Sequence, residues 1–533
     1  MNNSVVLTSD RGSFSDYSGA NALGYIACMP KRLVPRMFMD KFFNPPMRAY
    51  GNGEAVLAPY ALRKVEAILS ASGISDVIVS PPEHLKKVVG SSTRVVGITA
   101  HDPYGLSPVS TKLSLMFGGG ESWTATYFTE LSETIKDLKK KYSFKVFAGG
   151  PGIWQLDLKR PDWIDVIFSG EAEIDLPPMI HDILHSKPTK EKVYGKDPAI
   201  DQIPTIIKPS RYGEVQVTRG CPRGCQFCSI TPEMFRSIRL DDIIKEVSVN
   251  VEAGLRSIDL VTDDILLYGS SRLKTNHERV VELFMKVKEA GAREIYFPHI
   301  SSPAVKESPE TVMDLAGIAE YDKYRGEVPV VGLESGSERI IDKYMRGKAF
   351  PWTPSDWGLI ICDSAEIMND AGISPCFTMT IGFSDETSDD VNSTIALANR
   401  LIDGGYRAFM FPLPVIPITK SRLRKNAFPS AEALPSNYWD LLQLCWNHDL
   451  KVIRLMVPDL TYRMGHPLIR TLTGIMMDRI FSGIDNFFEQ LRDTKGKKAI
   501  EYSNIQLESL FGTMKSIYFI GKKVFGSHHQ TIN

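Results

Sequence analysis

Three cysteines stand close together near the middle of the chain, with the spacing C-x3-C-x2-C. They are Cys221, Cys225 and Cys228, and two glycines, Gly220 and Gly224, allow the loop that carries them to fold back sharply. Three thiolates gathered in one loop can each bind a different iron of a cubic [4Fe–4S] cluster. The loop offers no fourth cysteine. The pattern therefore predicts one iron that stays open to a small molecule.

A zinc knuckle, or a structural loop of clustered thiols, is the alternative interpretation. Zinc would need a fourth Cys or His in a regular pattern nearby, and the sequence shows no obvious one. The remaining cysteines are scattered and are expected to be small core residues: Cys28, Cys362, Cys376 and Cys445. The iron–sulfur interpretation is favoured, and an exposed cluster of this kind indicates a reducing, low-oxygen cytoplasm.

The elements on either side of the cysteine loop must position its thiols. Residues 213–217 are predicted to form a strand and residues 240–252 a helix, which has Asp241 and Asp242 in its first turn. A ligand loop at the carboxyl end of a strand is where open α/β sheets and barrels place their chemistry.

Strands and helices continue to alternate beyond this first unit. Five further strands are predicted at 257–261, 295–298, 328–333, 376–381 and 408–411. Five further helices are predicted at 276–290, 310–319, 337–344, 356–371 and 389–403. Six βα units predict a partial (β/α)6 barrel.

The cysteine spacing, with Phe227 directly before the third cysteine, resembles the radical S-adenosylmethionine (radical SAM) superfamily. The resemblance implies that the open iron chelates the amino and carboxylate groups of SAM. It also implies that an electron from the cluster cleaves SAM to methionine and a 5′-deoxyadenosyl radical. That radical would abstract hydrogen from an unactivated C–H bond, and an external electron donor such as ferredoxin or flavodoxin is expected.

Two motifs at the ends of predicted strands support the resemblance. Thr262, Asp263 and Asp264 follow the second strand, where the superfamily has a glycine/acid motif that holds the SAM amino group. Here acids replace the glycines.

After the fourth strand, Gly332-Leu-Glu-Ser-Gly-Ser337 closely matches the family's G-[IL]-E-[ST]-G-[ST] segment. Its polar residues Glu334, Ser335 and Ser337 suit hydrogen bonds to a ribose and a carboxylate.

The fifth strand carries a segment that resembles the adenine-side motif G-x-I-x-G-x-x-E. It runs from Thr380 through Gly382 to Glu386, with Thr378 where the first glycine would be. An acid at a strand end is also a common helix cap, so the argument depends on four motifs occurring in order.

Three other residues are expected near the mouth of the barrel. His299 follows the third strand, where contact with SAM or substrate and a purely structural role are both open. Tyr268 and Tyr344 are candidate donors of a hydrogen atom or proton, and nothing in the sequence selects between them.

The N-terminal part also alternates. Strands are predicted at 5–7, 77–79, 94–100, 145–148 and 165–168, and helices at 58–72, 83–89, 127–142 and 172–184. Such units predict a parallel, doubly wound sheet covered on both faces, of flavodoxin-like type. Residues 11–53 are rich in aromatics, Met, Gly and Pro and are expected to form a lid or wrapping arm.

Glycine-rich loops at the ends of these strands resemble the cobalamin (B12)-binding domain that precedes the radical SAM domain in one large class. The matching residues are Gly149 and Gly150 in one loop and Gly170 and Glu171 in another. The D-x-H-x-x-G motif that supplies an axial histidine elsewhere is absent, and His101 lies near that place in a different context. Bound cobalamin and a retained fold with an altered pocket therefore both remain open.

The chain of 533 residues is expected to contain an N-terminal arm and B12-binding-type domain (1–190), a linker (191–209), a radical SAM barrel (210–425) and a helical C-terminal domain (426–533). A net charge of −1 gives no attraction to nucleic acid. The first residues lack the features of a signal peptide, and no apolar run approaches the ~20 residues of a spanning helix. A cytoplasmic location is predicted.

The C-terminal region is rich in apolar residues at helical spacing. After a predicted helix at 438–455, two further apolar sets occur: Leu468, Ile469, Leu472, Ile475, Met476, Ile480, Phe481, Ile484, Phe487 and Phe488, and then Leu510, Phe511, Met514, Ile517, Tyr518 and Phe519. These helices are expected to pack on the barrel. The alternative is an amphipathic surface that touches the inner face of a membrane or admits a lipid chain.

Taken over its whole length, the chain is loosely similar to archaeal radical SAM synthases that form cyclopentane rings in tetraether (GDGT) lipids. This similarity predicts an apolar lipid substrate. The alternative is a cobalamin-dependent C-methyltransferase acting on a lipid or protein side chain. A non-catalytic iron–sulfur sensor is disfavoured, because a sensor does not need the motifs around Glu334 and Glu386.

Overall fold

The computed structural model describes most of the chain. It covers residues 3–17, 21–230, 233–271, 273–322, 326–418, 420–431, 433–462, 482 and 485–497. The two apolar sets predicted near the C-terminus lie outside these residues, apart from Phe487 and Phe488, which are buried. None of the described helices is long and apolar enough to cross a membrane.

The N-terminal part is a six-stranded sheet in the order β2-β1-β3-β4-β5-β6, with every pairing parallel. Its strands are β1 (Val5–Ser9), β2 (Val77–Val79), β3 (Val95–Thr99), β4 (Lys145–Gly149), β5 (Val166–Ser169) and β6 (Lys192–Tyr194). The strand order reverses between β1 and β3, and open α/β sheets bind ligands at the carboxyl edge beside such a point.

Helices cover both faces of this sheet because successive side chains of a strand point to opposite sides. Val5 and Leu7 pack with one set of helices, α3 (Tyr60–Ala71) and α8 (Leu176–Leu184). Val6 packs with the other set, α4 (Leu85–Val88), α6 (Trp123–Lys139) and α7 (Ile153–Leu158). The predicted doubly wound sheet is confirmed.

The barrel is built from two three-stranded parallel sheets, in the orders β11-β10-β7 and β12-β13-β14. Their strands are β7 (Glu214–Gln216), β10 (Ser257–Val261), β11 (Glu294–Tyr296), β12 (Val330–Glu334), β13 (Cys376–Ile381) and β14 (Phe409–Pro414). A bridge between His299 and Val330 joins the two halves. All six strands agree closely with the sequence prediction, and the result is the expected open barrel.

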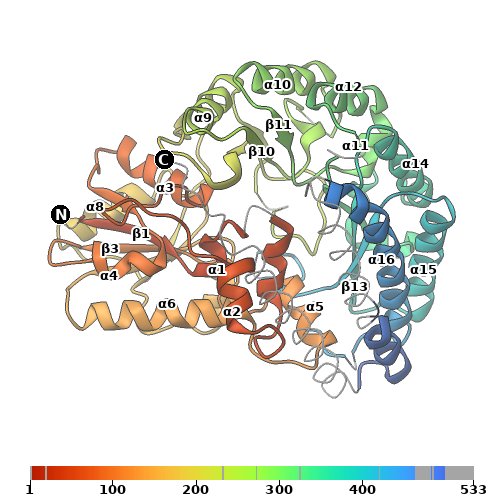
Figure 1. The fold of residues 1–533 in the computed structure, drawn as a ribbon, viewed down its shortest axis with the longest axis horizontal. Coiled ribbons are helices and arrows are strands. Elements are labelled where there is room, and N and C mark those ends of the chain that lie inside the picture. The colour runs from red at the N-terminus through yellow and green to blue at the C-terminus, as the bar shows by residue number, and fades with distance from the viewer. Residues whose placement is uncertain are drawn as a thin grey trace.

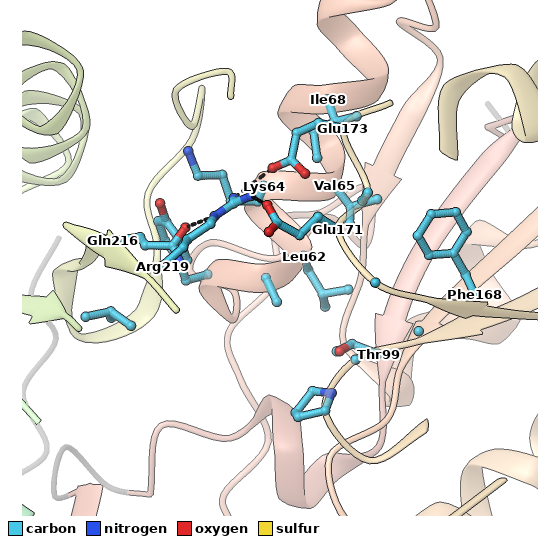
Figure 2. A pocket seen from close by; sticks show the side chains of 18 of the residues that line it. Leu62, Lys64, Val65, Ile68, Thr99, Phe168, Glu171, Glu173, Gln216 and Arg219 are labelled. Atoms are coloured by element: carbon cyan, nitrogen blue, oxygen red, sulfur yellow. Dashed lines mark hydrogen bonds and ion pairs between the residues drawn. The ribbon is translucent and has the colours of Figure 1, made fainter. Parts of the chain in front are cut away.

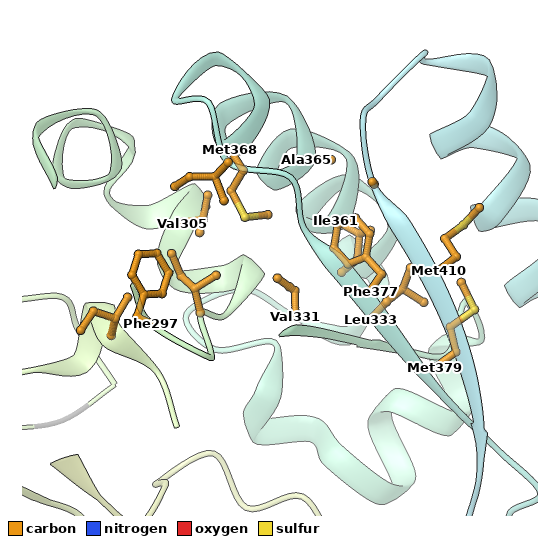
Figure 3. Packing of buried hydrophobic residues seen from close by; sticks show 14 of the residues in the cluster. Phe297, Val305, Val331, Leu333, Ile361, Ala365, Met368, Phe377, Met379 and Met410 are labelled. Carbon is orange, nitrogen blue, oxygen red and sulfur yellow. The ribbon is translucent and has the colours of Figure 1, made fainter. Parts of the chain in front are cut away.

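An arc of helices surrounds the barrel strands (Figure 1). They are α9 (Leu240–Glu252), α10 (His277–Glu289), α11 (Ser302–Glu307), α12 (Pro309–Ala319), α13 (Glu338–Met345), α14 (Trp357–Asp370), α15 (Ser388–Asp403) and α16 (Tyr438–Tyr462). The outward faces of the strands form a continuous apolar core with them. In Figure 3, Phe377 and Met379 of β13 and Met410 of β14 lie in this core with Ile361 and Ala365 of α14.

The N-terminal third reaches into the open side of the barrel, between β14 and β7. Figure 1 shows α1 (Arg11–Phe14), α2 (Arg36–Phe38) and α5 (Pro108–Met116) at this place, and α5 packs against β14. The predicted arm at residues 11–53 contains α1 and α2, together with a 3-10 helix at Asn21–Cys28 and a short π-helix at Met39–Phe43.

Several elements depart from the expectation, among them α7 and α11, which were not predicted, and α5 and β6. Helix α5 was not predicted, because its sequence is rich in Ser and Thr, which are weak helix formers. Ser107 caps its first turn and Pro108 fixes its start. Strand β6 lies inside the predicted linker; two of its three side chains are exposed, so it shows no apolar alternation.

Candidate active site

The cysteine loop leaves the barrel through a short antiparallel pair of strands. Thr218 of β8 (Thr218–Arg219) pairs with Ser237 of β9 (Arg236–Ser237). Gly220 has a φ of +74°, and a Cβ there would lie 2.7 Å from the carbonyl oxygens of Glu233 and Met234. A glycine is therefore required where the two ends of the loop meet.

The three predicted cluster ligands lie in this loop within electrostatic reach of one another. Cys225 is buried, and Cys221 and Cys228 are half-buried. Burial raises the pKa of Cys221 to about 11 and that of Cys225 to about 12, although the nearby Lys348 cation opposes the latter shift. The Ile230 N–H donates to Cys228 Sγ at 3.4 Å. The Cys221 and Cys225 thiols are therefore protonated until a metal displaces their protons.

No three Cys, His, Asp or Glu side chains within the described ranges converge on a single metal position. An iron–sulfur cube does not need such convergence, because each of its thiolates binds a different corner.

Arg223 anchors the cysteine loop to the barrel. Its guanidinium is buried, lies 3.2 Å from Asp264 Oδ2 and donates to Ser301 Oγ at 2.6 Å. The Ser301 N–H and hydroxyl both donate to Asp264 as well. Asp264 was predicted to hold the SAM amino group. In the structure its carboxylate instead accepts hydrogen bonds from Arg223 and Ser301.

Glu334 joins β12 and β13 to the cysteine loop. Its Oε1 accepts from Lys348 Nζ at 2.5 Å and its Oε2 from Thr380 Oγ1 at 2.5 Å. Burial opposes the charge of Lys348, but attraction to Glu334, Cys225 and Cys221 outweighs it and raises the pKa of Lys348. Glu334 has a φ of +64°, which is unusual for a non-glycine residue. Such strain is typical of functional positions.

Lys348 is the functional candidate that the sequence analysis missed. A Cβ on Gly332 would lie 2.1 Å from Lys348 Nζ, so a glycine at this position makes room for the ammonium group. The glycine of the matched segment was the available signal, but it does not say which side chain fills the space.

The two serines of that segment, Ser335 and Ser337, form hydrogen bonds with other parts of the protein. Ser335 is fully buried and shares hydrogen-bonding contacts with Thr394 and the Ser337 N–H. Ser337 caps α13 and donates to Asp390 at 2.6 Å. The structure therefore gives both hydroxyls structural partners, although they were predicted to bind a cofactor.

Thr262 and His299 connect neighbouring strands at the barrel mouth. The Thr262 and Thr218 hydroxyls are 2.6 Å apart, and His299 Nδ1 lies 3.0 Å from the Thr262 carbonyl oxygen. Because a carbonyl only accepts, Nδ1 carries the proton in this contact, which leaves Nε2 as an acceptor. Burial lowers the pKa of His299, in agreement with a neutral ring.

Two carboxyl groups near the mouth have raised pKa values. Burial, with Glu233 and Asp264 nearby, raises the pKa of Asp263 to about 7. Burial likewise raises the pKa of Glu386 to about 7, even though the Gly382 and Phe383 N–H groups donate to its Oε2. The second oxygen, Oε1, is buried without a hydrogen-bond partner in the described structure.

The three aromatic residues predicted near the site, Phe227, Tyr344 and Tyr268, make two kinds of contact. Phe227 packs edge-on against Phe383, whose ring stacks on Tyr344 at 4.3 Å. Tyr344 also donates to Asp385. Tyr268 is buried and donates to the Ile238 carbonyl oxygen at 3.2 Å, so its hydroxyl is engaged by the scaffold.

The first cavity, of about 540 Å³, lies between the carboxyl edge of the N-terminal sheet and the barrel mouth (Figure 2). From the sheet side it is lined by the predicted residues Gly149, Gly150, Gly170 and Glu171. From the barrel side it is lined by Thr218, Arg219, Thr262, Asp263 and His299. The structure thus brings both predicted groups of residues to one space.

Glu171 serves mainly to hold the two parts of the chain together. It accepts from Arg219 and Arg236, and Arg219 also donates to Glu173 at 2.7 Å. Figure 2 shows Arg219 between Glu171 and Glu173 at one side of the cavity. The prediction that Glu171 binds a cofactor is not supported by its contacts, because its carboxylate is paired with arginines from the barrel.

Comparisons with known proteins agree with this geometry. Residues 215–398 match the Radical SAM superfamily. A curated relative of Pyrococcus horikoshii, an uncharacterized methyltransferase, is 24% identical over 317 residues, which are 53% of this chain and 63% of the relative. A tRNA-2-methylthio-N(6)-dimethylallyladenosine synthase of Methylococcus capsulatus is 23% identical over 286 residues, 51% of this chain and 57% of that protein. The chain therefore matches less than two thirds of the length of either relative.

A solved structure has a similar fold over most of the chain. It is the radical S-adenosylmethionine methyltransferase TsrM from Kitasatospora setae with cobalamin and a [4Fe–4S] cluster bound. The TM-score is 0.52 with 13% identity, and the match covers 79% of this chain and 77% of that chain. The two share an architecture of a parallel sheet joined to a partial barrel.

Proposed function

Because the chain contains a radical SAM domain, we propose that it is a cobalamin-dependent radical SAM methyltransferase. The observation that carries the proposal is the first cavity. A ligand seated on the glycine loops of the N-terminal sheet would face the barrel mouth directly, across one continuous space of about 540 Å³. Such a juxtaposition suits a reaction that passes a group between two cofactors.

On the barrel side, the residues present fit an iron–sulfur cluster and SAM. Cys221, Cys225 and Cys228 would hold the cluster, which when bound supplies an electron to the sulfonium of SAM. Glu334 and Lys348 form a fixed ion pair beside these thiols. The pair offers both an acceptor and a cation to the polar groups of SAM.

On the sheet side, the cavity wall suits a large flat ligand with an apolar end. The apolar part of its lining comes from the sheet and α3: Leu7, Leu62, Val65, Ile68, Phe147 and Phe168. Polar groups at the mouth include Thr99 and Gln216. These residues would hold a cobalamin, which when bound would supply a methyl carrier.

The chain offers no histidine from the loop after β1 to the cobalt. That loop reads Asp10-Arg-Gly12, and Asp10 accepts hydrogen bonds from the Ser13 N–H and hydroxyl. His101, which the sequence analysis placed near this position, is not part of the first cavity. The glycine loops with Gly149, Gly150 and Gly170 would hold the cofactor without a histidine from this loop.

Support for the ring-synthase prediction is weaker. The relatives described above are methyltransferases and methylthiotransferases, and none is a lipid ring synthase. Lipid ring formation and contact with a membrane thus remain predictions from the sequence alone.

Sulfur insertion also has less support from this chain. It would need a second sulfur-bearing centre, and the four cysteines outside the loop lie on four different elements: Cys28, Cys362, Cys376 and Cys445. No two of these four cysteines are closely spaced in the sequence, so they do not form a second ligand loop like that of Cys221, Cys225 and Cys228.

The deciding experiment is anaerobic purification and reconstitution of the full chain. Stoichiometric cobalamin, a four-iron spectrum and a gain of CH2 in an acceptor, seen by mass spectrometry, are expected. Retained SAM cleavage without cobalamin, with loss of two hydrogens from a lipid, would favour ring formation instead. If the protein carries an intact cluster but does not cleave SAM, the interpretation as a non-catalytic iron–sulfur sensor would be favoured.

A further inference from the structure

A strongly basic segment follows β14 and packs against the cysteine loop. It reads Lys420-Ser-Arg-Leu-Arg-Lys425, so four of its six residues are basic. Around it, the sequence contains no Asp or Glu from residue 404 through residue 431. Arg422, Arg424 and Lys425 are exposed, and within the described residues none of the three pairs with an acid. Such a run of charge creates a local positive potential even though the whole chain has a net charge of −1.

Gln226 is the residue at which this segment meets the cysteine loop. Its carbonyl oxygen accepts from the Arg422 N–H at 2.9 Å. Its own N–H donates to the Tyr344 carbonyl oxygen at 3.0 Å, and its Nε2 donates to the Lys343 carbonyl oxygen at 2.7 Å. Gln226 therefore holds the cysteine loop against both the basic segment and the C-terminal end of α13.

The end of α13 brings two more cations to the same place. Lys343 and Arg346 are exposed there and pair with Asp385 and Asp342. The side chains of the two cations are 52% and 75% exposed, so solvent screens both pairs. Together with three cations of the basic segment, they form a surface that we call the basic patch: Lys343, Arg346, Arg422, Arg424 and Lys425.

Exposed apolar side chains lie beside the basic patch. Phe350 is 49% exposed in the turn that follows α13, and its carbonyl oxygen accepts from Arg223 of the cysteine loop. Gly347 of the same turn lies directly on the loop, since its Cβ would be 2.4 Å from the Arg223 carbonyl oxygen. Pro222 of the loop is exposed as well. Apolar surface rimmed by charged groups is typical of protein interaction sites.

The basic patch is nearer to the cluster ligands than to the place of the proposed methyl carrier. Gln226 directly follows Cys225 and stands two residues before Cys228, and the Cα atoms of consecutive residues are about 3.8 Å apart. None of the five patch residues lines the first cavity. A methyl acceptor has to reach that cavity, whereas a partner that only delivers electrons has to approach the cluster. The position of the patch therefore favours an electron carrier over a substrate.

We propose that the basic patch, together with Phe350, docks an acidic electron-carrier protein of the flavodoxin type. The carrier gives one electron to the cluster that the three loop cysteines hold, so the carrier is oxidised, the cluster is reduced and no covalent bond changes. Positive side chains around the contact attract an acidic protein over a long range and orient it. The inference rests on the iron–sulfur part of the proposed function and is independent of methyl transfer.

The test is equilibrium binding of an oxidised acidic flavodoxin to the anaerobically reconstituted full chain. Binding is expected at about 0.1 M salt and should weaken strongly at about 1 M, where the Debye length falls from about 10 Å to about 3 Å. A triple variant, Arg422→Glu, Arg424→Glu and Lys425→Glu, should weaken the binding about tenfold or more at the lower salt. It should fold, because residue 422 bonds Gln226 through its backbone N–H.

The matched control makes the same change of net charge elsewhere. It combines Lys86→Glu, Lys141→Glu and Lys190→Glu, three exposed lysines of the N-terminal part, and should bind flavodoxin as the wild type does. Phe350→Ala should weaken binding but keep its salt dependence, since it removes apolar contact and no charge. All variants should keep the iron content of the wild type. The rate at which reduced flavodoxin bleaches the cluster absorbance should fall in the patch variant and not in the control.

Unchanged binding by the patch variant, an equal loss in the control, or no binding by the wild type at the lower salt would each overturn the proposal. A short single-stranded RNA is the competing probe, because a basic surface also attracts phosphates. If the RNA bound the patch more tightly than flavodoxin does, the proposal would be wrong as well. Neither cobalamin nor a methyl acceptor takes part in these measurements, so a failure of methyl transfer would leave them unchanged.

Discussion

Lys348 Nζ lies 2.5 Å from Glu334 Oε1, and the pair is almost completely buried, with side-chain exposures of 12% and 6%. The same ammonium is close enough to Cys225 and Cys221 to interact with them electrostatically. The Lys348 cation therefore interacts both with the carboxylate of Glu334 and with the thiols of the cysteine loop. Any change in it should affect SAM binding and the cluster together.

Replacing Lys348 by Met should leave Glu334 as an unpaired buried charge. Breaking a buried pair in this way costs about 3–5 kcal/mol of stability, measurable as a lower midpoint of urea denaturation. Loss of the cation should also make a reconstituted cluster harder to reduce. Lys343→Met is the control, because its pair with Asp385 is 52% and 35% exposed, and a pair so screened by solvent should contribute little to stability. Equal losses in the two variants would contradict the role given to Lys348.

Replacing Cys221, Cys225 or Cys228 by Ala should remove the cluster. Each thiolate is expected to hold one iron, so a single substitution should lower iron content and abolish SAM cleavage. Iron analysis and the visible absorption of anaerobic protein provide the measurement. Cys362→Ala on α14 should retain both properties, and a cysteine-loop variant that keeps its iron would refute the assignment.

Gly150→Ala should disturb the first cavity without touching the cysteine loop. Gly150 has a φ of +98°, and its Cβ would lie 2.5 Å from Thr99 Oγ1 and 2.8 Å from the Ala100 carbonyl oxygen. We expect weaker cobalamin binding, followed by absorbance titration. Gly254→Ala is a close control, because Gly254 has a φ of +93° but nothing within 4 Å of its Cβ. If both variants bind cobalamin equally well, the glycine loop is not part of that site.

Glu386 should make stability depend on pH. Its pKa in the folded chain is about 7, above the ordinary value of 4.5, so the folded state holds the proton more tightly than the unfolded state. Stability from this group is complete below about pH 4.5 and is lost as the pH rises to about 7, by up to about 3 kcal/mol. Glu386→Gln should flatten the dependence of the denaturation midpoint on pH in that window. An unchanged slope would show that the carboxyl group titrates normally.

Arg219→Met should loosen the joint between the sheet and the barrel. Arg219 is half-buried and pairs with Glu171 and Glu173 from the N-terminal part. The connector between β6 and β7 should then be cut faster in limited proteolysis. Arg279→Met removes an exposed pair with Glu282 on α10 and should leave the cleavage rate unchanged. Identical rates in the two variants would mean that the charge cluster does not hold the parts together.

The regular elements of the fold could be predicted from sequence because their patterns are strong. The barrel strands combine apolar residues with glycine-bounded ends, and α9 begins and ends at the predicted residues 240 and 252. Elements without such a pattern were missed. Strand β6 has three residues and little apolar character, and α5 is held by its contact with β14 rather than by helix propensity.

Side-chain partners were harder to predict than positions. The motif around Glu334 was found, but sequence spacing does not tell that Ser337 caps a helix whereas Glu334 turns toward Lys348. In the same way, Glu171 was located correctly at the cavity, yet its pairing with Arg219 joins residues 48 positions apart. Such long-range pairs depend on how the two parts of the chain meet.

The barrel described above does not close on itself, because within the described structure β7 and β14 each pair with a single neighbour. Unpaired strand edges are templates for association with other chains. In the intact protein, α16 covers the β14 edge, where the Met410 N–H is bound by Asp449, and the N-terminal arm fills the gap. A fragment reduced to the barrel alone would expose both edges and self-associate. The N-terminal arm and α16 therefore keep these strand edges from pairing with another chain.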